Sequence, residues 1–569
     1  MLLSNFNLLA TAPGGVARLR ELILTLAVQG KLVPQDPSDE PASVLLKKIR
    51  AEKDRLIAEG KIKRDKPLAE IAEEEKPFEL PRGWEWVRCS DYFFELCTGP
   101  FGSVIHQEDY VRGGVPLINP SHMLEGRIVH DPRVTLNPKD AERLSAYALS
   151  AGDIVLARRG EVGRYALVTE REHGWLCGTG SFFARLHATC NREYLGLLFT
   201  DNRFRQHLQG QSVGTTMTNL NPGILLDALI AVPPLAEQFR IVTRVEELMH
   251  VCDALEVKGR LEAAQHIQLV STLLGTLTGS NTPETLAQNW QRIATHFDLL
   301  LDRPQAIDAL EQTILQLAVR GLLVPQDRSE EPASALLQKI RAEKDHLILE
   351  GKIKRDKPLQ PVAEDEKPFA LPEGWSWVRF DELTHPLKPI AYGVLVPGPD
   401  VVTGIPFVRI ADLSLTNPST KPEKSISTEI DAQFQRTRLE GGEILMGVVG
   451  SIGKLGIAPP TWAGSNIARA ICRIVPADSG LREFVIFLLQ TEFMQKSFAG
   501  DTRTLAQPTL NIGLIRQALT PIPPPAEQAR IVARVEELRR LCANLRQRLS
   551  ASQTIQAHLA EALVESMAG

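Results

Sequence analysis

The chain has 569 residues, of which 43% are hydrophobic and 23% charged, so it can form several domain-sized cores. Its formal net charge of −5 excludes a protein that holds nucleic acid through bulk positive charge. The seven cysteines form no CxxC pair, which favours a reducing cytoplasm and indicates neither a disulfide framework nor a zinc site. We expect no membrane span and no signal peptide, because no run of 18 apolar residues and no basic amino-terminal region occurs.

The chain is a tandem duplication. Residues 30–68 recur as residues 321–359 at a constant offset of 291, and 32 of the 39 positions are identical. Solenoid repeats have periods of roughly 20–50 residues. The repeated unit is much longer than that, so each copy must be a domain-sized unit.

Each copy begins with two predicted helices. Gly30 ends the first helix and Gly321 its repeat. Helical spacing of apolar residues marks the first helix: Leu19, Leu22, Ile23, Leu26 and Ala27. Ser38 or Asp39 is the expected N-cap of the second helix, with Pro41 in its first turn. A basic stretch, residues 61–66, then precedes an acidic one; we interpret both as solvated connectors, with phosphate or partner contact as the alternative for the basic stretch.

Tryptophans mark the start of the next domain in each copy. Trp84 and Trp86, and their repeats Trp375 and Trp377, alternate with polar residues as in a half-buried strand, which favours a core position over a base-stacking surface. From there to about residues 232 and 522 the copies diverge and keep only short matched blocks at offset 290. We expect a mixed α/β domain of about 150 residues in each copy.

Each divergent domain ends in a long predicted helix that begins after prolines. Apolar residues recur at 4-3 spacing, which is typical of a coiled-coil seam: Ile241, Val245 and Leu248 in the first copy, and Ile531, Val535 and Leu538 in the second. Each helix can run about 40 residues, with Gly259 as a candidate interruption of the first. Residues 276–295 are predicted to be the linker between copies.

The predicted fold class is therefore α+β, with two mixed α/β domains joined by long helices that form an antiparallel coiled coil and with a pseudo-twofold internal repeat. The predicted domains are an amino-terminal helical arm (1–83), a first divergent domain (84–233), a central region with seam helix, linker and repeated arm (234–373), a second divergent domain (374–523) and a carboxy-terminal seam helix (524–569).

No catalytic motif is present. The sequence contains no GxxxxGK[ST] loop, no GxSxG elbow, no HExxH pair and no NPPY-type methyltransferase tetrapeptide. We therefore expect no catalytic residues and no metal site. A constant frame around two divergent inserts instead indicates two different targets presented at a fixed separation.

Polar residues in the matched loops are the candidates for DNA contact. Arg158, Arg159 and Arg164 flank turn glycines, and arginine can pair with guanine edges or hold phosphates, although surface salt bridges are an equal alternative. Lys454 takes the place of Arg164 in the second copy, and Arg409 that of Asn119. Two loops rich in Thr, Asn and Gln suit adenine edges and phosphates, or form plain polar turns: their candidates are Thr216, Asn219, Thr504 and Gln507.

The chain resembles the specificity subunits of type I restriction-modification systems over essentially its whole length. The resemblance rests on PPLAEQFRIVTRVEEL and PPPAEQARIVARVEEL, which close the divergent domains, and on the blocks GDIVLARRGEVG and GEILMGVVGSIG. It implies two target recognition domains that read the halves of a bipartite, asymmetric double-stranded DNA site. It also implies a non-catalytic subunit that docks two methyltransferase subunits and a restriction/translocase subunit, with S-adenosylmethionine, ATP and Mg²⁺ bound by those partners.

Two other classes of protein remain open. One is a nuclease or methyltransferase with a divergent site, which turnover by the isolated chain would reveal. The other is a duplicated coiled-coil adaptor that binds two proteins and no DNA. Exchange of one insert between related chains discriminates, because only a recognition subunit would change half of a DNA motif.

Overall fold

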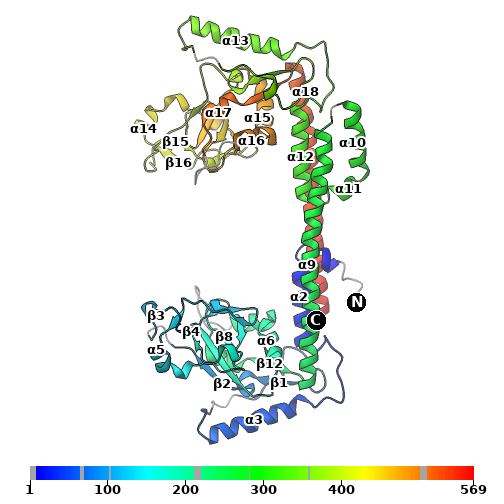
Figure 1. Cartoon of the computed structure of the whole chain (residues 1–569), viewed down its shortest axis with the longest axis vertical. Helices are drawn as coiled ribbons and strands as arrows, with labels where there is room; N and C mark the ends of the chain where they lie inside the picture. Colours follow the sequence, from blue (N-terminus) through cyan, green and yellow to red (C-terminus); the bar gives the residue numbers. More distant parts are fainter. Residues whose placement is uncertain are drawn as a thin grey trace. The chain divides into compact units, whose positions relative to one another are not determined.

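The computed structural model describes residues 8–64, 69–100, 104–210, 220–280, 282–355, 359–499 and 509–568 (Figure 1). The chain forms two compact units. The first comprises Met1–Glu262 and Gln553–Gly569, and the second Ala263–Ser552. Two 44-residue helices, α9 (Leu235–Thr278) and α18 (Pro525–Ala568), each contribute residues to both units.

The arm helices follow the apolar pattern of the sequence. All five expected apolar residues of α2 (Gly15–Val28) are buried, and Gly30 ends the helix at φ 69°. A Cβ on Gly30 would lie 2.6 Å from Pro81, so both the conformation and the space require glycine. The expected N-cap of α3 (Ala42–Ala58) was wrong, because the cap position is Pro41 and Asp39 instead forms an ion pair with Arg240.

The first divergent domain contains two four-stranded sheets. One has the order β2-β11-β8-β9 and is antiparallel, and the other has the order β10-β4-β7-β3. Continuous apolar runs form the centre of the first sheet, where β8 is buried along its length. The elements of this domain are β1 (Glu85–Arg88), α4 (Cys89–Tyr92), β2 (Phe93–Thr98), β3 (Tyr110–Val111), β4 (Val115–Ile118), β5 (Met123–Leu124), β6 (Arg127–Ile128), β7 (Thr135–Leu136), α5 (Pro138–Arg143), β8 (Ile154–Ala157), β9 (Tyr165–Leu167), β10 (Leu176–Cys177), β11 (Ser181–Leu186), α6 (Arg192–Thr200), α7 (Asn202–Gly210), α8 (Pro222–Asp227) and β12 (Leu229–Val232).

The second divergent domain has the same plan. Its sheets have the orders β14-β20-β17-β18 and β16-β15-β19. With this repeated mixture of helices and strands, the predicted α+β fold class is confirmed. The elements are β13 (Ser376–Arg379), β14 (Ala391–Tyr392), β15 (Ile405–Val408), β16 (Lys424–Ile426), α14 (Thr428–Ala432), β17 (Ile444–Gly447), β18 (Leu455–Ile457), β19 (Asn466–Ile467), β20 (Ile471–Ile474), α15 (Arg482–Gln490), α16 (Glu492–Ala499), α17 (Ile512–Gln517) and β21 (Leu519–Ile522).

The first and last strands of each divergent domain pair with each other. β1 pairs antiparallel with β12, with Trp86 opposite Ala231, and β13 pairs with β21 in the same register. The chain therefore enters and leaves the domain at one point. We call the arm helices, these paired strands and the start of the long helix the frame of each unit. The residues between the paired strands can change in sequence while the frame keeps its structure.

A buried carboxylate joins three parts of the frame in each unit. Glu237, at the start of α9 and 1% exposed, accepts hydrogen bonds from Trp84 Nε1 (3.0 Å) and Gln35 Nε2 (2.8 Å). Glu527 at the start of α18 accepts the same two bonds, from Trp375 Nε1 (2.9 Å) and Gln326 Nε2 (2.8 Å). Burial raises the pKa of both carboxyl groups. The arm, the first strand and the long helix are thus fixed to one another.

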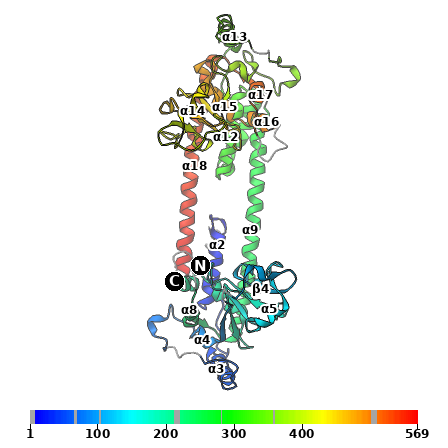
Figure 2. The ribbon, with the colours of Figure 1, turned by 90° about the vertical axis from the view of Figure 1, so that its left-hand side faces the viewer.

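An arm helix packs with the long helices in each unit (Figure 2). In the first unit, α2 forms ion pairs with α9 through Arg20 and with the end of α18 through Arg18, which lies 2.9 Å from Glu561. In the second, α12 (Pro304–Val319) forms ion pairs with α18, and α13 (Ala333–Leu349) follows it. The seam residues lie in these cores: Ile241, Val245, Ile531 and Val535 are buried, and Leu248 and Leu538 are half-buried.

Residues 276–295, predicted to be the linker between copies, are mostly helical. The helix α9 runs through Gly259 without a break and ends at Thr278, and α10 (Pro283–Thr295) begins five residues later. The Thr282 hydroxyl caps α10 by accepting a hydrogen bond from the Thr285 N–H. A short helix, α11 (Phe297–Leu300), then leads into α12.

Candidate nucleic-acid interface

Three loops of the first divergent domain meet at one place. We define the first loop cluster as residues 119–122 after β4, 158–164 between β8 and β9, and 177–180 between β10 and β11, with Leu220. Main-chain hydrogen bonds join them: Gly178 N–H donates to Ile118 (2.8 Å), Arg158 to Gly180 (2.8 Å), and Leu220 to Arg158 (2.9 Å). The residues on this surface therefore come from segments that are far apart in the sequence.

The second divergent domain forms the same cluster from different side chains. The second loop cluster comprises residues 409–412, 448–454, 467–470 and Leu510. The matching bonds run from Ala468 to Val408 (2.9 Å), from Val448 to Ala470 (2.8 Å) and from Leu510 to Val448 (2.8 Å). Because these bonds use only main-chain atoms, the side chains can vary while the loops keep their positions. A surface that reads different sequences with one backbone needs this property.

The three predicted arginines of the first cluster differ in their surroundings. The Arg158 guanidinium lies 5.8 Å from the centroid of Phe182, and burial together with the neighbouring charge of Arg159 lowers its pKa. The Arg159 side chain is exposed and forms no ion pair among the described residues. Arg159 is therefore the cation of this cluster that can most easily meet a base edge or phosphate.

Arg164 and Lys454 have the same structural contact in the two copies. Arg164 Nη1 donates to the carbonyl of Pro120 (3.4 Å) and the guanidinium also pairs with Glu161, whereas Lys454 Nζ donates to the equivalent carbonyl of Ile410 (2.8 Å). Each cation ties the turn between two strands to the neighbouring 3-10 turn. A phosphate could reach only the remaining N–H groups of either side chain.

Arg409 is held by two carboxylates in the second cluster. Its Nη2 lies 3.0 Å from Glu423 and its Nε lies 3.5 Å from Asp412. Contact with DNA would require exchange of at least one of these ion pairs. The other four predicted contacts, Thr216, Asn219, Thr504 and Gln507, lie outside the described residues.

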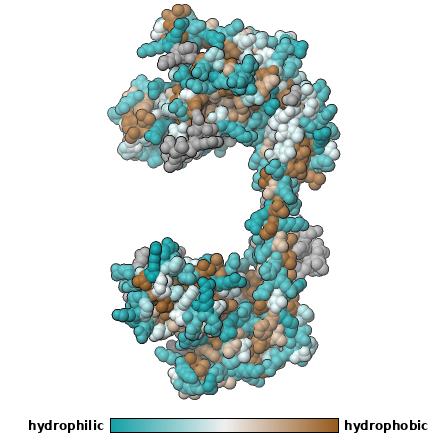
Figure 3. Space-filling model, viewed as in Figure 1, coloured by the Kyte–Doolittle hydropathy of each residue, from teal (hydrophilic) through white to brown (hydrophobic). Residues whose placement is uncertain are grey.

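The sequence analysis missed Arg469. This residue lies in the turn between β19 and β20, its side chain is exposed, and it forms no ion pair with any part of the chain that the structure describes. Its equivalent in the first copy is Thr179. Alignment of the two turns would have revealed the substitution, since the matched loops differ there by a full charge. The visible face of each divergent domain is largely hydrophilic, with scattered apolar residues (Figure 3).

Two kinds of feature are absent from the described residues. They contain no group of three or more His, Cys, Asp or Glu side chains that could hold a metal ion. None of their helices is long and apolar enough to span a membrane.

Comparison with known proteins gives matches over nearly the whole chain. The family model "Type I restriction modification DNA specificity domain" matches residues 81–265 and 400–552. The chain is 37% identical to the type I restriction enzyme EcoAI specificity subunit of Escherichia coli over 97% of its own length and 94% of that protein. It is 36% identical to the EcoEI specificity subunit of the same organism, with the same coverage. Among solved structures it is similar to the HsdS subunit from Thermoanaerobacter tengcongensis, with 20% identity, a TM-score of 0.39, and 86% and 98% of the two chains covered.

Proposed function

Because the chain belongs to the family of type I restriction-modification DNA specificity subunits, we propose that its two loop clusters each read one half of a bipartite, asymmetric DNA site. Recognition of DNA sequence without catalysis is the role of this family. Catalysis belongs to the partner subunits. Beyond this family role, we infer that the DNA site has two halves and that one loop cluster reads each half.

The observation that carries the proposal is the pair of loop clusters with one backbone and different charges. At the equivalent turn positions the first cluster has Arg159 and Thr179, and the second has Val449 and Arg469. An arginine that pairs with a guanine contributes about 1–3 kcal/mol of discrimination. Two clusters that place arginine at different points would therefore prefer different half-sites.

The long helices support a fixed spacer between the half-sites. The start of α9 and the end of α18 share the core of the first unit, and the end of α9 and the start of α18 share the core of the second. This arrangement favours the antiparallel coiled coil expected from the seam. A 44-residue helix is about 66 Å long, and one turn of B-DNA is about 34 Å. Each helix is thus longer than one turn of B-DNA.

The repeated frame supports docking of two methyltransferase subunits. The arm, the paired strands and the start of the long helix recur in both units. Each unit can therefore present the same docking surface to one methyltransferase subunit. A restriction/translocase subunit would complete the complex. S-adenosylmethionine would be bound by the methyltransferase, and ATP and Mg²⁺ by the restriction subunit.

Sequencing of methylated DNA tests the proposal. The chain is co-expressed with its methyltransferase, and N6-methyladenine is mapped in the host genome. We expect a new split motif with two short half-sites around a constant gap, absent without this chain. A stable complex that methylates no new motif would favour the adaptor function instead.

A further inference from the structure

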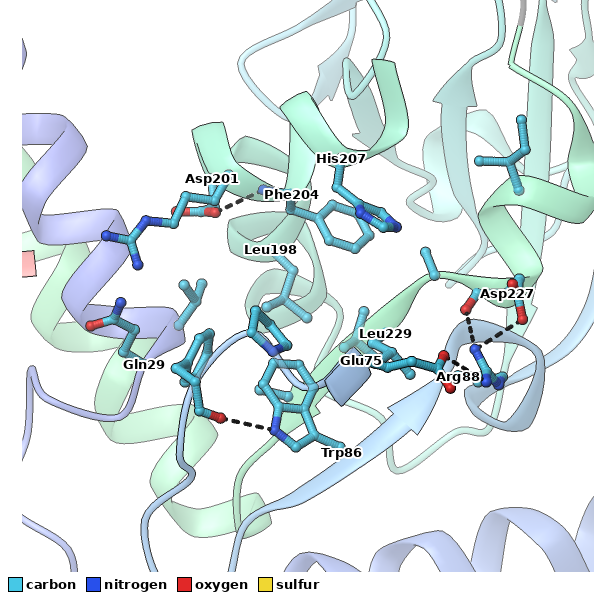
Figure 4. Close-up of a pocket in the computed structure, with 18 of the residues that line it drawn as sticks. Gln29, Glu75, Trp86, Arg88, Leu198, Asp201, Phe204, His207, Asp227 and Leu229 are labelled. Atoms are coloured by element: carbon cyan, nitrogen blue, oxygen red, sulfur yellow. Dashed lines mark hydrogen bonds and ion pairs between the residues drawn. The ribbon is translucent and has the colours of Figure 1, made fainter. Parts of the chain in front are cut away.

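A pocket of about 600 Å³ opens in the first unit between the frame and helix α7 (Figure 4). None of its lining residues belongs to the first loop cluster. The aromatic pair Phe78 and Trp86 forms one side of it, with ring centroids 4.9 Å apart and an interplanar angle of 63°. Phe204 and His207 of α7 face Trp86 across the space. The pocket thus presents aromatic surface on two sides.

The second unit shows what packs on this aromatic pair. Phe369 and Trp377 repeat it, with centroids 5.0 Å apart at 60°. A third ring, Phe493 of α16, completes the group at 5.9 Å from Phe369 and 6.1 Å from Trp377. The second copy therefore supplies a phenyl ring to the pair from its own chain.

The first unit has a charged residue where the second has this ring. Helices α7 and α16 are equivalent at offset 290, which places Arg203 at the position of Phe493. Arg203 lines the pocket and is exposed. Gln29, which also lines the pocket, is equivalent at offset 291 to Arg320, whose guanidinium lies 4.8 Å from the Phe369 centroid in the second unit. Both residues that cover the aromatic pair in the second unit are thus replaced in the first.

We propose that this pocket binds an aromatic side chain of a methyltransferase subunit, at the place where the second unit uses Phe493. The inference rests on the proposed function. The chemistry of the occupant follows from the duplicate, in which a phenyl ring packs edge-on against the same Phe–Trp pair.

The proposal makes the two docking surfaces of the chain unequal. A methyltransferase subunit on the first unit inserts a ring into the pocket, whereas one on the second unit meets a closed aromatic group. The two subunits should therefore bind with different affinities, in two separate steps. An asymmetric chain can use this difference to add its partners in a defined order.

The test uses the full chain and its purified methyltransferase subunit. The variant R203F installs the residue that the second unit has naturally, and R203K keeps the position cationic and serves as its control. Sedimentation velocity and titration calorimetry give the number of subunits bound and the affinity of each step. We expect R203F to weaken one of the two steps about tenfold or more and R203K to leave both unchanged.

A second variant guards against misfolding of the first. Q29R installs the other residue of the second unit and should weaken the same step. Two subunits bound as tightly to R203F and Q29R as to the wild-type chain would overturn the pocket assignment alone. Failure of the wild-type chain to bind any methyltransferase subunit would instead overturn the proposed function. A small molecule retained by the isolated wild-type chain in native mass spectrometry, and lost in R203F, would also overturn the assignment to a partner side chain.

Discussion

An ion pair between arm and long helix has opposite polarity in the two units. In the first, Arg20 of α2 lies 2.6 Å from Asp253 and 3.6 Å from Glu256 of α9. In the second unit the equivalent residues carry the opposite charges. Glu311 of α12 replaces Arg20, Arg546 of α18 replaces Glu256, and the two lie 3.2 Å apart. Each arm helix is thus complementary to its own long helix, and an exchange of arms would bring like charges together.

We predict that R20E destabilises the first unit and that R20E combined with E256R recovers part of the loss. The side chains of Arg20, Asp253 and Glu256 are 28%, 60% and 46% exposed, so solvent screens the pairs and each contributes about 0.2–1 kcal/mol. R20E removes two such pairs and adds repulsion of similar size, for a loss of about 1–3 kcal/mol. The double variant restores one pair in the polarity of the second unit and should regain about 0.5–1 kcal/mol.

The assay is urea unfolding followed by circular dichroism, analysed as a double-mutant cycle at low and high salt. The coupling energy should be favourable and should shrink as salt rises, because the groups are largely exposed. The equivalent cycle, E311R with R546E, is the matched control in the second unit. A double variant no more stable than R20E alone would refute the complementarity argument.

Three further predictions concern single groups. E237Q should cost about 1–3 kcal/mol in unfolding free energy, because the amide N–H₂ would face the Trp84 or Gln35 donor, and E527Q should have the same effect in the second unit. Burial raises the pKa of Asp153 from 3.8 to about 6, so its stabilising contribution is full below pH 3.8 and is lost as pH rises through about 6; D153N should remove that pH dependence from urea unfolding curves. R159A and R469A should each relax methylation at a different half-site, by about 1–3 kcal/mol of discrimination against a guanine, and sequencing should show the other half-site unchanged.

The repeated frame could be predicted from the sequence, whereas its details could not. Apolar spacing predicted the arm helices and the buried seam because the period of the apolar residues indicates which face of a helix is buried. Helix α10 was not predicted because Gly275, Gly279 and Pro283 suggested turns, although Leu286, Trp290 and Ile293 carry a helical pattern directly after them. Here the glycines lie in or at the end of α9, and Pro283 begins the next helix.

The candidate site was predictable as a set of loops, but the roles of its side chains depend on contacts between distant segments. The sequence places a cation at residues 164 and 454. It cannot show that each reaches a carbonyl more than 40 residues earlier in the chain, at Pro120 and Ile410. The same limit applies to Arg409, whose ion pair with Glu423 crosses from one loop to another. Arg159 and Arg469 can be identified as candidates for DNA contact only after the cations with structural contacts have been recognised.

Residues of the frame differ between the copies for other reasons than residues of the loops do. Glu237 and Glu527 are identical because both units need the same internal bonds. Arg20 and Glu311 differ because each must match its own helix. Arg203 of α7 and Phe493 of α16 occupy equivalent positions, and neither pattern accounts for their difference. Phe493 packs on the aromatic pair of its unit, whereas Arg203 lines a pocket beside the pair of the other. A duplicated chain that docks two identical partners on equivalent surfaces would have no reason to keep that difference, so the pocket points to partners bound in unequal ways.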